Sequence, residues 1–186
     1  MAADPIVCTP EEVLSFWFEE CTSEDWFRST VALDEEMRRR FRDTHLALAA
    51  GVPDLWCVTP ESRLAAVIVL DQFARNIYRG TPLAFATDGL ALQEAKEALQ
   101  LGADRGMPAE RRIFFYLPFE HAEDLAEQDR SVALFRSLGL EEQIDYAVRH
   151  RAIIAAYGRF PHRNVFLGRV STEAEKDYLA EPGAGF

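Results

Sequence analysis

Three short stretches of the sequence carry the residues that could do chemistry. The first stretch consists of Asp71, Gln72, Arg75, Asn76 and Arg79. On a helix, its aspartate and two arginines lie within about 80° of one another, on one face. An aspartate and an arginine four residues apart form a weak ion pair when that face is solvated. The same face continues the apolar stripe of Leu64 and Ile68, so the stretch predicts either such a pair or a polar recess.

The second stretch places a histidine beside a carboxylate, shortly after a proline. Glu120 and His121 follow Pro118, and a proline inside a helix kinks it and frees a backbone carbonyl. A histidine beside an acid can serve as a general base or as a ligand, although a lone histidine more often has a structural role. The acidic residues that follow are interpreted as a solvated helix face: Glu123, Asp124 and Glu127.

The third stretch is a basic loop at residues 158–169. It contains Arg159, His162, Arg163, Asn164 and Arg169. Arginine side chains and backbone N–H groups in such a loop can hold a phosphate or a carboxylate. The same arginines can instead neutralise buried carboxylates of the protein itself. On either interpretation we expect the loop to meet Asp71 or Glu120 rather than bulk water.

The sequence lacks the usual signatures of metal and cofactor sites. It contains no HExxH, GxGxxG, P-loop or GxSxG pattern. Its four histidines, His45, His121, His150 and His162, show no zinc spacing, and its three cysteines form no CxxC pair. We therefore expect no metal and no cofactor.

Charge and composition limit the class of partner. The chain of 186 residues has a net charge of -11, which argues against nucleic acid or an anionic membrane as the main partner. The longest apolar runs have seven residues, whereas a membrane-spanning helix needs about 20. No secretion signal begins the chain, and three cysteines, an odd number without CxxC spacing, fit a reducing compartment. We expect a cytoplasmic protein, and the oligomeric state stays open.

Helix-start and helix-stop residues recur along the chain, and no window alternates as a strand would. The predicted helices cover residues 10–20, 33–50, 60–79, 87–101, 109–127, 130–138, 141–157 and 172–180. Short loops between long helices favour antiparallel neighbours. The prediction is an all-α fold, an antiparallel helical array, in a single domain over residues 1–186 whose termini, 1–8 and 181–186, are loose.

Two of these helices contain seven consecutive apolar residues, 64–70 and 113–119, and each run is followed by a carboxylate, Asp71 or Glu120. A helix that is apolar on all sides must be buried. If one antiparallel helix separates the two, they run parallel, and their carboxylates come within about one helix-packing distance. The predicted core includes Leu64, Val67, Ile68, Phe114, Phe115, Leu117, Ile153 and Ile154.

Several strings resemble a bacterial family known as domain of unknown function 924. They are VLSFWFEE, LDQFARNIYRGT, AFATD, FFYLPFEHAED, GRFPHRN and LGRVST, and they extend over residues 13–179. The resemblance implies an all-α fold similar to tetratricopeptide-like superhelices. It supplies no catalytic residues, because the family has no established activity. One departure is Ala74, where the family usually has proline.

Three functional hypotheses follow. The first is a binding module that grips an anionic small ligand or a peptide carboxylate through Arg75, Arg79, Arg159 and Arg163. The second is an enzyme for hydrolysis or proton transfer, with His121 or His162 as general base, oriented by Glu120 or Asp71. The third is a purely structural arginine–carboxylate network. We favour binding, because the sequence offers arginine anchors and no activated nucleophile.

Overall fold

The structure, a computed structural model, describes residues 7–28 and 30–185, and within these ranges it contains helices and no β-strand. The α-helices are α1 (Pro10–Ser15), α2 (Ser23–Phe27), α3 (Val31–Ala50), α4 (Pro60–Ile68), α5 (Ala74–Ile77), α6 (Asp88–Gln100), α7 (Ala109–Glu120), α8 (Leu125–Leu138), α9 (Glu141–Tyr157), α10 (Asn164–Leu167) and α11 (Glu173–Leu179). The predicted all-α class is confirmed, whereas the tetratricopeptide-like superhelix stays a prediction. Most of the N-terminal segment predicted to be loose, residues 1–6, lies outside the described residues, as does residue 186.

Local capping explains where several helices begin. Thr9 and Thr172 each accept a backbone N–H from three residues ahead, and Glu12 and Glu175 complete the two capping boxes. Both boxes were expected from the sequence. The short helices α2 and α10 were not, because four or five residues carry too little periodicity to be recognised.

The sequence predicted one helix over residues 109–127. The predicted end is wrong, because α7 ends at Glu120. Asp124 is the N-cap of the next helix, α8. Its Oδ1 accepts the N–H groups of Ala126 at 2.9 Å and Glu127 at 3.1 Å, which is the geometry of an N-cap. Glu123, Asp124 and Glu127 therefore do not share one face of one helix with Glu120.

The helix expected at 60–79 is interrupted by a π-helical turn, Val69–Phe73, between α4 and α5. A second π-helical turn, Phe16–Glu20, follows α1. Short π segments inside helices are rare and often occur at functional positions. The wider turn rotates the residues that follow Phe73 relative to those of α4, so the two groups do not share the helix face that a regular α-helix would give them.

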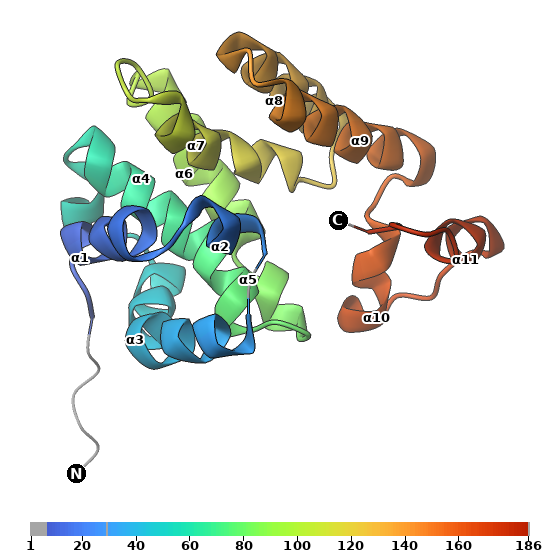
Figure 1. Cartoon of the computed structure of the whole chain (residues 1–186), viewed down its shortest axis with the longest axis horizontal. Helices are drawn as coiled ribbons and strands as arrows, with labels where there is room; N and C mark the ends of the chain where they lie inside the picture. The colour runs from blue at the N-terminus through green and yellow to red at the C-terminus, as the bar shows by residue number, and fades with distance from the viewer. Residues whose placement is uncertain (1–6, 29, 186) are drawn as a thin grey trace. The chain divides into compact units, whose positions relative to one another are not determined.

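The chain divides into two compact units, and the division falls within α7. Unit 1 consists of the described residues of Met1–Arg79 and Leu83–Pro118. In it, α4 packs against α1 and α6, and α3 packs against α5; α4 and α1 lie beside each other in Figure 1. Aromatic rings fill its centre: the Phe41 ring lies 4.8 Å from the rings of both Phe16 and Phe73.

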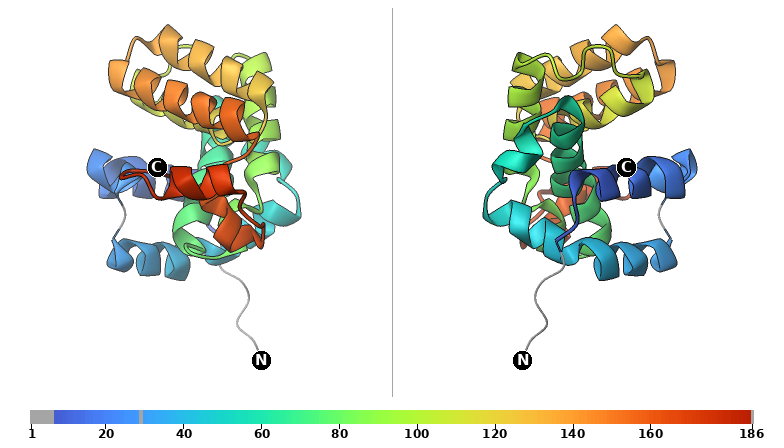
Figure 2. Two further views of the ribbon diagram at one scale, coloured as in Figure 1. Left: turned by 90° about the vertical axis from the view of Figure 1, so that its right-hand side faces the viewer. Right: turned by 90° about the vertical axis from the view of Figure 1, so that its left-hand side faces the viewer.

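Unit 2 consists of Gly80–Pro82 and the described residues from Phe119 onward. Its α8 and α9 form an antiparallel hairpin (Figures 1 and 2). Beyond α9 a single 3₁₀ turn, Pro161–Arg163, leads into α10 and α11. Buried Ile153, Ile154 and Phe160 form a small core with Tyr157 and Tyr178.

The predicted core is confirmed. All eight of the core residues predicted from the sequence are buried, with exposed fractions of at most 8%. Within the described ranges, no helix combines the length and the apolar composition that a membrane crossing requires. The single domain stays a prediction, and the two units are described separately below.

Candidate functional site

The first polar stretch builds a buried ion-pair cluster in unit 1. Asp71 lies in the π-helical turn and is 1% exposed. Arg75 Nη1 lies 3.2 Å from Asp71 Oδ1 and donates to the Asp71 carbonyl at 2.6 Å, while Gln72 donates to the Asp71 carboxylate. Arg75 also binds both carboxylate oxygens of Asp88, at 3.0 and 3.2 Å. The expected i,i+4 pair therefore exists, but it is buried rather than solvated.

The rest of that stretch is occupied by a carboxylate from α3. Arg79 donates to the two oxygens of Asp34 at 2.6 and 3.1 Å, and Asn76 Nδ2 donates to Asp34 Oδ1 at 2.8 Å. Burial acts to lower the pKa of Arg75, but Asp71 and Asp88 outweigh it and raise that pKa. Both arginines of unit 1 predicted to bind a ligand are thus bound to the protein's own carboxylates.

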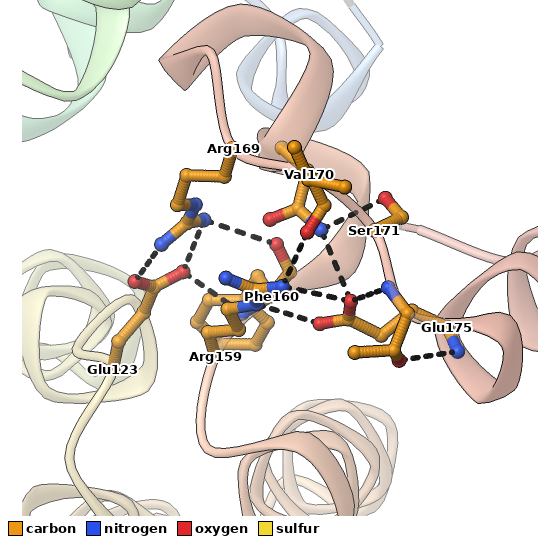
Figure 3. A network of polar contacts seen from close by, with 9 residues as sticks. Glu123, Arg159, Phe160, Arg169, Val170, Ser171 and Glu175 are labelled. Carbon is orange, nitrogen blue, oxygen red and sulfur yellow. Dashed lines mark hydrogen bonds and ion pairs between the residues drawn. The ribbon is translucent and has the colours of Figure 1, made fainter.

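In unit 2, Arg159 pairs with Glu175 at the start of α11 (Figure 3). Arg159 Nε and Nη2 donate to the two oxygens of Glu175 at 2.6 and 2.8 Å, and Nη2 also reaches the Val170 carbonyl at 2.9 Å. Thr172 N–H and Asn164 Nδ2 donate to the same carboxylate, at 2.7 and 3.5 Å. The hydrogen bonds from Arg159 are the main reason that the pKa of Glu175 is lowered to about 2.

Arg169 pairs with Glu123, on the other side of the chain segment that contains Arg159 and Phe160 (Figure 3). Its two Nη atoms donate to Glu123 at 2.6 and 2.9 Å, and the Phe160 N–H donates to Glu123 Oε1 at 2.8 Å. Burial acts to raise the pKa of Glu123, and the hydrogen bonds from Arg169 and Phe160 lower it overall.

Two arginines of the basic loop therefore neutralise carboxylates other than the two that the sequence suggested. Arg159 and Arg169 are paired with Glu175 and Glu123, where Asp71 or Glu120 had been expected. Glu123 had been interpreted as solvated because it was placed on a continuous helix. Once α7 ends at Glu120, Glu123 belongs to a loop and can turn toward the arginine.

Three histidines gather around Phe160 in unit 2, and we call them, together with Phe160 and Arg163, the histidine cluster. The His121 and His150 rings lie 6.4 Å apart, and the Phe160 ring lies 5.5 Å from His150 and 5.7 Å from His162. The Arg163 guanidinium lies 4.5 Å above the Phe160 ring, within the range of a cation–π contact.

A carboxylate accompanies the cluster. Glu120 Oε1 lies 3.4 Å from His150 Nδ1, and the same nitrogen lies 2.9 Å from the Tyr146 carbonyl, which fixes it as the N–H donor. Among the residues with described positions, no three His, Cys, Asp or Glu side chains are placed to hold a metal ion. The cluster can nevertheless offer imidazole nitrogens and a guanidinium to a ligand.

Burial lowers the pKa of His150 to about 3 and that of His162 to about 4, and the Arg163 charge acts in the same direction. Both imidazoles are therefore neutral at pH 7. His150 and Arg163 are each 6% exposed, whereas His121 and His162 are only partly buried. His121 and His162 are thus the members of the cluster whose side chains retain some exposure to solvent.

Sequence reasoning named Glu120, His121, His162 and Arg163 but missed His150 and Phe160. His150 lies on the buried face of α9, between Ala147 and Ile154. A polar residue at helical spacing among buried apolar ones was the available signal. The idea that the polar stretches of both units form one site stays a prediction.

Fold and site together define an all-helical protein with internal arginine–carboxylate networks and a partly buried histidine cluster. The model of the family described as bacterial protein of unknown function, DUF924, matches residues 13–183, and the chain belongs to this family. The chain is also similar to the solved structure of a protein of unknown function from Agrobacterium tumefaciens, with 42% identity and a TM-score of 0.88. That match covers 93% of this chain and 97% of the other. No curated protein matches the chain.

Proposed function

We propose that the chain is a binding protein whose histidine cluster takes a small anion, a carboxylate or a phosphate. The observation that carries this proposal is the gathering of three of its four histidines with buried Arg163 around Phe160. Imidazole N–H groups and a guanidinium are the donors that proteins offer to oxyanions. Perturbed histidines in one place are typical of functional sites.

Charged groups of both signs lie around the cluster. Arg163 and Arg169 supply two positive charges, and Glu120 and Glu123 supply two negative ones. An arriving anion adds a negative charge that a protonated imidazole can neutralise. Because the anion favours the charged imidazole, it raises the pKa of His162, and affinity increases as the pH falls.

The proposal is narrower than the four-arginine site suggested by the sequence. Arg75, Arg79 and Arg159 hold Asp88, Asp34 and Glu175. Of the four predicted anchors, we keep Arg163, because its guanidinium lies 4.5 Å above the Phe160 ring, within the histidine cluster. We also keep the cytoplasm as the proposed location, since Cys8, Cys21 and Cys57 form no disulfide, as is usual in a reducing compartment.

The test is a titration with inorganic phosphate, followed through the imidazole nitrogen signals in NMR spectra. The signals of His121 and His162 should move and saturate, while His45 in unit 1 serves as the reference within the same sample. His162→Gln should weaken binding about tenfold, in line with about 1.5 kcal/mol for a hydrogen bond to a charged group. Chloride at equal ionic strength is the control. If all four histidines respond alike, or none responds, the proposal is wrong.

An acid–base enzyme is the second candidate, and the Glu120–His150 pair favours it. An imidazole held by a carboxylate on one nitrogen can act as a base through the other. The pKa of His150, about 3, argues against this candidate, because a base that weak has little driving force to abstract a proton at pH 7. Binding therefore has the better support.

A further inference from the structure

The segment after α11 folds back on unit 2, where the sequence suggested a loose terminus. Glu181 N–H donates to the Tyr178 carbonyl at 3.1 Å, and Ala184 N–H donates to the Glu181 carbonyl at 3.1 Å. Gly185 N–H then donates to the Tyr178 hydroxyl at 3.2 Å. Figure 2 shows this segment continuing from α11. The tail is thus held by its own turn and by one tyrosine.

Gly185 lies directly against a member of the histidine cluster. A Cβ atom built on Gly185 would lie 2.7 Å from His162 Cβ and 3.0 Å from His162 Cγ, closer than side chains pack. Its φ of +76° is also one that other residues rarely adopt. Glycine at this position therefore permits an approach between the tail backbone and the imidazole that any side chain would prevent.

We infer that residues 181–185 form a strap that covers His162 and must move aside before an anion reaches the imidazole of this residue. This inference rests on the proposed function, because the strap covers part of the proposed binding site. Residues 181–183 are exposed, and the strap is held by few hydrogen bonds. Segments with few buried contacts open at low free-energy cost. A closed strap reduces the apparent affinity in proportion to the fraction of molecules that are open.

The test variant is Gly185→Val, whose side chain has no room beside His162. Two readouts follow the opening: the rate at which diethyl pyrocarbonate modifies His162, mapped by mass spectrometry, and the affinity for phosphate from the NMR titration. Both should rise about two- to tenfold, the range that corresponds to losing one hydrogen bond. Tyr178→Phe removes the hydroxyl that Gly185 binds without adding bulk, and it should act in the same direction.

Gly183→Val is the matched control. Gly183 has a similar φ of +79°, but a Cβ there meets nothing within 4 Å, so this variant carries the same backbone strain without a clash with His162. Both readouts should therefore rise less in Gly183→Val than in Gly185→Val. If all forms bind phosphate equally well, the strap is refuted and the binding proposal stands. If His162 becomes more reactive in Gly185→Val while no form binds phosphate, the anion site is refuted and the strap remains as a cover. Unchanged reactivity in both Gly185→Val and Tyr178→Phe refutes the strap itself.

Discussion

At the scale of single residues, Glu175 serves two elements at once. It closes the capping box at the start of α11, and it binds Arg159, which follows α9. The box was readable from the sequence because Thr172 and Glu175 are three residues apart. The ion pair with Arg159 could not be predicted in the same way, because sixteen residues separate the two and no local pattern links them.

Glu175 should make the protein sensitive to acid well below neutral pH. Its pKa falls from 4.5 to about 2 in the folded protein, so the charged form stabilises the fold. That contribution is complete above the unfolded pKa and is lost as the pH falls from about 4.5 through about 2. Glu175→Gln should lower the free energy of unfolding at pH 7 by about 1.5–3 kcal/mol and flatten its decline over that acid window.

Urea melts at a series of pH values measure this effect. Glu173→Gln is the control: Glu173 lies in the same helix, but its side chain is 88% exposed and pairs with Lys176 at the surface. Its replacement should change stability by less than about 0.5 kcal/mol. Equal losses in the two variants would show that the Arg159 pair contributes nothing particular.

At the scale of elements, periodicity and capping located most helices, while the π-helical turns were not predictable. A π turn accommodates one additional residue, so it leaves the apolar run intact and shifts only the register beyond it. Arg75 and Arg79, placed on one face by the sequence, bind different carboxylates because α5 ends at Ile77 and Arg79 lies beyond the helix: Asp71 and Asp88 for Arg75, and Asp34 for Arg79.

The π turn also gives position 74 an unusual tolerance. Ala74 directly follows the π turn, and its N–H donates to the Gln72 carbonyl rather than to a carbonyl one turn back, so a proline there gives up no regular helical hydrogen bond. Ala74→Pro should therefore change the free energy of unfolding by less than about 1 kcal/mol, in accord with the proline that the family usually has here.

Ala66→Pro is the matched comparison. Ala66 is as fully buried as Ala74 but lies inside α4, where proline removes a hydrogen bond and clashes with the preceding turn, at about 3 kcal/mol or more. Thermal or urea unfolding of the two variants gives the comparison. Similar losses at both positions would contradict the role assigned to the π turn.

At the scale of the whole molecule, the site depends on contacts that no local pattern contains. The apolar runs were enough to predict the core, because a helix that is apolar on all sides is stable only when it is buried. Glu123 and Arg169 are 46 residues apart, and the three histidines come from α9, the turn after α7 and the 3₁₀ turn Pro161–Arg163. Contacts between such distant residues follow from the packing of helices, which cannot be read from local patterns in a single sequence.

The two units should respond differently to mild acid, because unit 2 contains more histidines that burial keeps neutral. The pKa is lowered to about 3 for His150 and about 4 for His162 in unit 2, and to about 4 for His45 in unit 1. Each such histidine is protonated only after unfolding, so stability is complete above about pH 6.5 and declines as the pH falls toward the folded pKa. The decline reaches up to about 1.4 kcal/mol per pH unit for each histidine.

Amide hydrogen exchange between pH 6.5 and 5.0, corrected for the intrinsic exchange rate, measures this difference unit by unit. Two neutral histidines against one predict that the opening free energy of α8 and α9 falls about twice as steeply as that of α3 and α4. His162→Gln removes one of the two and should bring the slope for unit 2 close to that for unit 1. Saturating phosphate should flatten the same slope, because an anion at the histidine cluster allows the folded protein to take up the proton as well. Equal slopes in the parent protein would contradict the assignment of two neutral imidazoles to unit 2.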